Sequence, residues 1–140
     1  MRKVRKDFLH TLLQKTSDMS GYEFHEPKDL EAYGLSEQEM KDYISKYKLQ
    51  LAYNIEKEIP DGLTLEMDDE SFLILLVKHE NQIDSYSTLI HELVHYLQNK
   101  NGINYEEDVY KYELEAYQVQ KEYLNSKGQY ISISFNVSAR

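Results

Sequence analysis

Cysteine is absent from this chain of 140 residues. Its absence excludes disulfide bridges, thiolate metal ligands and cysteine nucleophiles. Basic charge is also scarce, because 16 lysine and arginine residues stand against 25 aspartate and glutamate residues, which gives a formal net charge of −9. A protein with no basic excess has little with which to replace the counterions of a phosphate backbone. We therefore expect no nucleic-acid partner.

Long hydrophobic runs are missing as well. The longest, residues 72–77, has the length of a strand and falls far short of the roughly 18 residues that indicate a membrane span. Charged residues interrupt the apolar ones at the start of the chain, which argues against a secretory signal. We expect a cytoplasmic protein with no membrane partner. Its length and its hydrophobic content of 41% are typical of one domain with its own core.

Apolar residues at helical spacing, together with capping signals, indicate helices in four parts of the chain. Ser36 and Glu39 have the spacing of a capping box, and Asn104 and Glu107 give a similar signal before the last helix. Gly102 follows the third helix as a stop signal. The expected helices cover about residues 3–16, 36–55, 84–101 and 105–126, the third beginning between residues 84 and 87.

Two segments have the pattern of strands. Apolar and polar residues alternate over residues 63–67, and residues 72–77 are continuously apolar. The two are close enough for a hairpin, and the second is a candidate edge for an extended peptide. We expect an α+β fold with about four helices and a small, mainly antiparallel sheet. The expected single domain, residues 1–140, has a helical N-terminal part over about 1–60, a core over about 63–126 and a C-terminal strand or arm at 130–138.

The third expected helix carries the sequence His91-Glu92-Leu93-Val94-His95. Residues four apart lie on one face of a helix, so His91 and His95 can direct a ring nitrogen at the same metal ion. Glu92 lies about 100° around the helix from His91, near enough to act on a water molecule without being a ligand. This pattern is typical of a zinc hydrolase site, with two ligands and a general base.

A catalytic zinc site needs a third protein ligand. No cysteine is available and no histidine follows His95, so we expect a carboxylate from the last helix. Glu113 and Glu115 are the leading candidates, because Ala116 next to them permits close packing against the motif helix. They cannot easily both be ligands, since positions i and i+2 point about 200° apart. The acidic residues available there are Glu106, Glu107, Asp108, Glu113, Glu115 and Glu122.

A His-Glu-x-x-His helix followed by a helical Glu-x-x-Ala resembles the gluzincin arrangement, and the short form over about residues 63–125 is similar to the ImmA/IrrE-like metallopeptidases. In that family the ligand glutamate lies three residues before the small one, which implies Glu113, with Glu115 as the alternative. The resemblance implies a minimal zincin-like fold with the motif on a central helix. Val94 and Tyr117 depart from the family, which often has glycine and asparagine there.

The resemblance implies a zinc metallopeptidase that hydrolyses a protein or peptide substrate. His91, His95 and Glu113 would hold Zn²⁺ and Glu92 would act as general base. The residue that stabilises the oxyanion stays open, and the candidates are Tyr110, Tyr112, Tyr117 and His79. The alternative is a non-catalytic zinc-containing module that binds or regulates a partner. One version of this alternative is a module that originates from a phage or a mobile element.

Overall fold

The computed structural model describes residues 1–47, 49 and 59–128. This part of the chain contains four α-helices and a four-stranded sheet, so the expected α+β class with about four helices is confirmed. The helices are α1 (Lys6–Ser20), α2 (Glu37–Lys46), α3 (Gln82–Lys100) and α4 (Val109–Ser126). The strands are β1 (Arg2–Lys3), β2 (Leu30–Leu35), β3 (Gly62–Glu66) and β4 (Phe72–Val77), and a short 3-10 helix, η1 (Tyr105–Glu107), precedes α4.

The sheet has the strand order β1-β2-β4-β3 and is mixed. The expected hairpin is confirmed, because β3 and β4 pair antiparallel with Leu63 opposite Leu75. β1 pairs antiparallel with β2, but β2 and β4 are parallel, with Leu30 opposite Phe72. The expectation that residues 72–77 offer an edge is wrong, since β4 lies between β2 and β3. Within the described residues β3 is the edge strand next to the hairpin turn.

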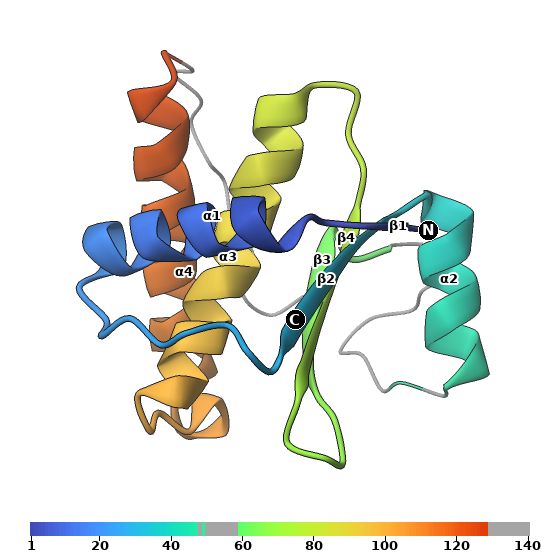
Figure 1. Ribbon diagram of the computed structural model, residues 1–140, viewed down its shortest axis with the longest axis horizontal. Helices are drawn as coiled ribbons and strands as arrows, with labels where there is room; N and C mark the ends of the chain where they lie inside the picture. The colour runs from blue at the N-terminus through green and yellow to red at the C-terminus, as the bar shows by residue number, and fades with distance from the viewer. Residues whose placement is uncertain (48, 50–58, 129–140) are drawn as a thin grey trace.

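Helices cover both faces of the sheet. Figure 1 shows α2 on one side and α1, α3 and α4 on the other. Successive residues of β4 face opposite sides: one set joins the core under α1, α3 and α4, and the other joins the cluster under α2. A strand buried on both faces reads as a continuous apolar run, which explains the sequence of residues 72–77. The first set is Phe72, Ile74 and Leu76, and the second is Leu73, Leu75 and Val77.

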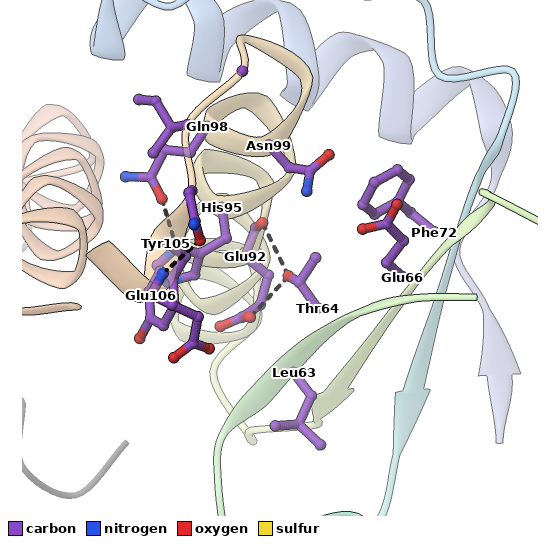
Figure 2. Close-up of a pocket in the computed structure, with 13 residues that line it drawn as sticks. Leu63, Thr64, Glu66, Phe72, Glu92, His95, Gln98, Asn99, Tyr105 and Glu106 are labelled. Atoms are coloured by element: carbon purple, nitrogen blue, oxygen red, sulfur yellow. Dashed lines mark hydrogen bonds between the residues drawn. The ribbon is translucent and has the colours of Figure 1, made fainter. Parts of the chain in front are cut away.

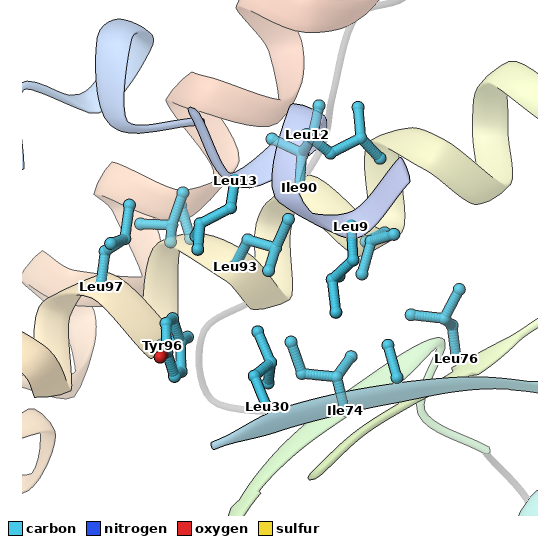
Figure 3. Close-up of a cluster of buried hydrophobic side chains, with 14 of the residues drawn as sticks. Leu9, Leu12, Leu13, Leu30, Ile74, Leu76, Ile90, Leu93, Tyr96 and Leu97 are labelled. Atoms are coloured by element: carbon cyan, nitrogen blue, oxygen red, sulfur yellow. The ribbon is translucent and has the colours of Figure 1, made fainter. Parts of the chain in front are cut away.

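The larger of these cores surrounds the motif helix. Leu9 and Leu13 of α1 pack over Ile90 and Leu93 of α3, and Leu30 of β2 lies beneath them (Figure 3). On another side α3 packs against α4, where Ala116 is fully buried. Burial on several sides fixes the orientation of α3, so the residues of its remaining face have defined neighbours.

Capping residues explain where the helices around the site begin. Asn81 Oδ1 accepts from the backbone N of Ile83 at 2.9 Å, so α3 begins at Gln82 rather than at the expected 84–87. The last helix also differs from the prediction. Asn104 caps η1 instead, and α4 begins after Asp108, whose side chain accepts from the backbone N of Lys111.

The N-terminal part contains more strand than expected. Residues 2–3 form β1 and residues 30–35 form β2, both inside the segment predicted to be helical. α1 runs past the expected end at residue 16 to Ser20, where Gly21 takes a left-handed conformation with φ of 82°. α2 ends at Lys46, short of the predicted residue 55. The rest of that predicted helix from residue 50 and the expected arm at 130–138 lie outside the described residues.

None of the helices in the described ranges combines the length and the hydrophobicity needed to cross a membrane.

Candidate metal centre

Two histidines of α3 and a glutamate of α4 meet in the interior between the helices. Glu113 Oε1 lies 2.9 Å from His91 Nε2 and 2.9 Å from His95 Nε2. The two Nε2 atoms are 3.3 Å apart. The Glu113 side chain is fully buried, and only 5% of the His91 side chain is exposed. The structure therefore brings the predicted residues His91, His95 and Glu113 together as one possible metal-binding group.

The outer ring nitrogens of both histidines are held by glutamines. His91 Nδ1 lies 3.0 Å from Gln120 Oε1, and His95 Nδ1 lies 2.9 Å from Gln98 Oε1. Each glutamine also donates its amide nitrogen, Gln98 to the carbonyl oxygen of Tyr112 and Gln120 to Ser87 Oγ, which fixes the amide orientation. In each histidine Nδ1 therefore faces a glutamine oxygen, and Nε2 is the ring nitrogen that faces Glu113 and would bind a metal.

This arrangement fits a divalent cation. Two imidazole lone pairs and a carboxylate oxygen that point at one another repel unless a proton or a metal ion lies among them. In a tetrahedral site with bonds of about 2.0–2.1 Å, donor atoms lie roughly 3.3 Å apart. The two Nε2 atoms have this separation, and the two distances from Nε2 to Glu113 Oε1 are shorter, at 2.9 Å. Nitrogen and oxygen ligands of this kind suit zinc and also accept other divalent metals.

The charges around His95 favour a positive group at this position. Burial lowers the pKa of His95, but the hydrogen bond to Glu113 and the negative charges of Glu92 and Glu113 outweigh burial and hold it above its usual value. Tyr105 donates to Glu113 Oε2 at 2.9 Å, which leaves Oε1 directed at the histidines. The site therefore has the electrostatic character of a cation site as well as the donor atoms.

Glu92 lies beside this cluster and is held by β3. Its Oε2 is 4.0 Å from His91 Nε2, and its side chain is 2% exposed. Thr64 Oγ1 lies 3.0 Å from Glu92 Oε1 and 3.1 Å from the Glu92 carbonyl oxygen, as Figure 2 shows. Gly62 leaves room for the same side chain, because a Cβ at Gly62 would come within 2.9 Å of Glu92 Cγ. Thr64 and Gly62 thus set the position of the carboxylate.

A cleft opens next to the cluster, with a volume of about 680 Å³. His95, Glu92 and Tyr105 line it on the helical side, and Thr64 and Glu66 line it from β3 (Figure 2). The side chains of both His95 and Glu92 therefore face a space large enough for part of a peptide. Of the three residues in the cluster, His95 is the one that lines this cleft, so the cleft meets the cluster at His95.

Glu115, the alternative third ligand, lies away from the cluster. Its Oε1 accepts hydrogen bonds from the Tyr22 hydroxyl and from Gln98 Nε2, the latter at 3.3 Å. Burial first, and then the hydrogen bond to Glu115, raise the pKa of Tyr22 far above its usual range, so this phenol remains a donor. Glu113 thus contacts the two histidines, whereas Glu115 contacts Tyr22 and Gln98.

The four candidates for oxyanion stabilisation are not brought to the cleft as donors. The Tyr117 ring packs edge-on against His91 with 4.5 Å between centroids. His79 Nε2 lies 3.9 Å from Asp61 Oδ1. Tyr110 is 63% exposed, and Tyr112 contributes its carbonyl oxygen to Gln98. None of the four lines the cleft, so none is favoured for the role.

Sequence reasoning missed the residues that support the cluster. Gln98 is three positions after His95, and Gln120 is seven after Glu113, so helical spacing places each near the face of the ligand it follows. The spacing of these two glutamines could have predicted their positions. Tyr105 lies in the 3-10 helix, and Gly62 and Thr64 lie on a strand far from the motif. Their proximity depends on tertiary packing, which no local pattern reveals.

No family model, curated protein or solved structure matches the chain. The likeness to the ImmA/IrrE-like metallopeptidases therefore rests on the motif residues alone.

Proposed function

We propose that this protein is a zinc metallopeptidase of the gluzincin type, with His91, His95 and Glu113 as zinc ligands and Glu92 as general base. The observation that carries the proposal is the convergence of His91 Nε2, His95 Nε2 and Glu113 Oε1 beside a cleft that Glu92 also lines. A purely structural site would need no buried carboxylate facing a cleft beside the metal. The resemblance to the ImmA/IrrE-like family supports the same assignment.

The chemistry divides between the metal and the chain. Bound zinc would polarise the carbonyl group of a substrate and lower the pKa of a water molecule. Glu92 accepts the proton of the attacking water and delivers it to the leaving amine. Thr64 hydrogen-bonds Oε1 of Glu92. The other carboxylate oxygen, Oε2, lies on the side of His91 Nε2, where the proton would be accepted. Tyr105 and the two glutamines hold the three ligands in place.

Strand β3 is suited to hold an extended peptide. It is the edge strand beside the cleft, and Leu63, Thr64 and Glu66 line that cleft. A peptide that pairs with such an edge gains backbone hydrogen bonds for any sequence, while side-chain contacts give selectivity. Because Thr64 on this strand also holds Glu92, a peptide paired with β3 would lie close to the general base.

Gly62→Ala is expected to lower peptide hydrolysis by about tenfold, because small displacements of a catalytic group are costly. The new Cβ would meet Glu92 Cγ at 2.9 Å and push the carboxylate from its position. Steady-state rates of the zinc-loaded variant measure the effect. Zinc affinity serves as the internal control and should stay within about twofold, because the three ligands lie on α3 and α4. An unchanged rate would show that Gly62 does not position Glu92.

Metal analysis and a peptide-library assay test the proposal itself. We expect one zinc ion per purified chain, cleavage of a subset of peptides detected by mass spectrometry, loss of cleavage after chelation and recovery with one equivalent of zinc. A protein that binds no zinc at micromolar concentration would overturn the whole proposal. A protein that binds zinc but cleaves no member of the library would remove the peptidase assignment and leave a zinc-binding module.

A further inference from the structure

We propose that Glu115 is a positioning residue that raises the zinc affinity of the site through Gln98 and His95. This inference rests on the proposed zinc site. Three residues form the connection: Glu115 Oε1 accepts from Gln98 Nε2 at 3.3 Å, and Gln98 Oε1 accepts from His95 Nδ1 at 2.9 Å. The opposite nitrogen of His95 is the one that faces Glu113. A negative charge is thus linked to the metal-binding atom by two hydrogen bonds and an imidazole ring.

Both hydrogen bonds run the same way along this connection: His95 donates to Gln98, and Gln98 donates to Glu115. Each bond therefore strengthens the other. The Gln98 amide nitrogen donates to a carboxylate, which polarises the amide and makes its oxygen a stronger acceptor. That oxygen draws the proton on His95 Nδ1, which leaves more electron density on Nε2. Partners of metal-bound histidines raise ligand basicity in this way. Glu115 therefore acts on the site although it is not a ligand.

The amide that transmits the effect is fixed. Gln98 is 1% exposed, and its nitrogen donates both to Glu115 and to the carbonyl oxygen of Tyr112. The Tyr22 hydroxyl donates to the same oxygen of Glu115. Ser17 Oγ in turn donates to the Tyr22 carbonyl oxygen at 2.6 Å. Rotation of Gln98 would break several bonds at once, so the carboxylate and His95 stay connected.

A different series of hydrogen bonds holds His91 in place. Its Nδ1 contacts Gln120 Oε1, Gln120 Nε2 donates to Ser87 Oγ, and Ser87 donates to the carbonyl oxygen of Asp84 at 2.8 Å. This second series of hydrogen bonds contains only neutral groups. The two histidine ligands are therefore unequal, with an anion behind His95 and none in the series behind His91. A charge change at residue 115 should affect the metal through His95.

Glu115→Gln tests the charge with little change of shape, because the new amide oxygen can still accept from Gln98 and Tyr22. We expect zinc affinity, measured by competition with a chelator of known affinity, to fall about tenfold, at the low end for partners of metal ligands. Glu122→Gln is the matched control, since Glu122 is an exposed acid on the same helix. A Glu115→Gln affinity within twofold of the parent would overturn the inference.

A double-mutant cycle separates the pathway from a general charge effect. In a Gln98→Leu background the link to His95 is absent, so Glu115→Gln should then change zinc affinity less than twofold. Gln98→Met is the second variant should Gln98→Leu fail to fold. An equal loss in both backgrounds would refute transmission through Gln98. The absorption spectrum of the Co²⁺ form provides a second readout, and we expect it to shift in Glu115→Gln but not in Glu122→Gln.

Failure of the inference and failure of the proposed function give different results. If the parent protein binds no zinc, the proposed function falls and with it the basis of the inference. If the parent and Glu115→Gln bind zinc equally well, the zinc site stands and only the role of Glu115 is refuted.

Discussion

Glu113→Gln is expected to weaken zinc binding by about a thousandfold, because bound structural zinc contributes roughly 10–16 kcal/mol and three ligands share that energy. The amide is a neutral and poorer ligand than the carboxylate, and among the described residues Glu113 is the one acidic residue of α4 in the metal-binding group. The new side chain has nearly the same shape and can still accept a hydrogen bond from Tyr105. Chelator competition measures the affinity directly.

Thermal unfolding gives an independent measure of the same loss. A ligand that binds only the folded state stabilises it by about 4 kcal/mol when present at a thousand times its dissociation constant. Added zinc should therefore raise the melting temperature of the parent and of Glu122→Gln but leave Glu113→Gln nearly unchanged. Glu115→Gln should retain most of the effect. A greater loss in Glu115→Gln than in Glu113→Gln would assign the ligand to residue 115.

The two histidine positions were predictable because their relation is local. His91 and His95 are separated by one helical turn, and the geometry of any helix places them on one face. The flanking residues from 88 to 97 contain no charge apart from Glu92. That composition predicts a buried helix, and α3 is indeed buried over most of this stretch. Local sequence sufficed here because secondary structure alone fixes the relation.

The choice between Glu113 and Glu115 could not be made from spacing. The two point about 200° apart on α4, so the rotation of α4 about its axis decides which one meets the histidines. That rotation is set by the packing of α4 against α3, with Ala116 fully buried. The family likeness implied Glu113, and the structure places Glu113 in the cluster. Physical reasoning from the sequence left both open.

Strand β2 was missed because its stability comes from distant partners. Leu30 and Ala32 alternate with polar or half-buried residues for only a few positions before Gly34. The strand pairs in parallel with β4, so Leu30 lies opposite Phe72. No turn signal connects two strands that are so far apart in sequence. The absence of β2 from the prediction also made β4 seem to be an edge strand.

Glu92→Gln is expected to lower the rate of peptide hydrolysis by about a thousandfold, within the range that general base catalysis contributes. An amide cannot accept the proton of the attacking water. The substitution keeps the shape of the side chain, and its oxygen can still accept from Thr64. Zinc affinity should change only a few-fold, because Glu92 lies outside the metal-binding group. Rates of the zinc-loaded variant under single-turnover conditions measure the loss.

Two companion variants separate catalysis by Glu92 from a role in folding or metal binding. Glu80→Gln removes an exposed acid ahead of α3 and should hydrolyse peptides at the parental rate. Glu92→Asp keeps a carboxylate but withdraws it by one methylene, so an intermediate rate is expected. Parental activity in zinc-loaded Glu92→Gln would rule out Glu92 as the base. Loss of zinc by that variant would instead make Glu92 a ligand, in conflict with its bond to Thr64 and its distance from the cluster.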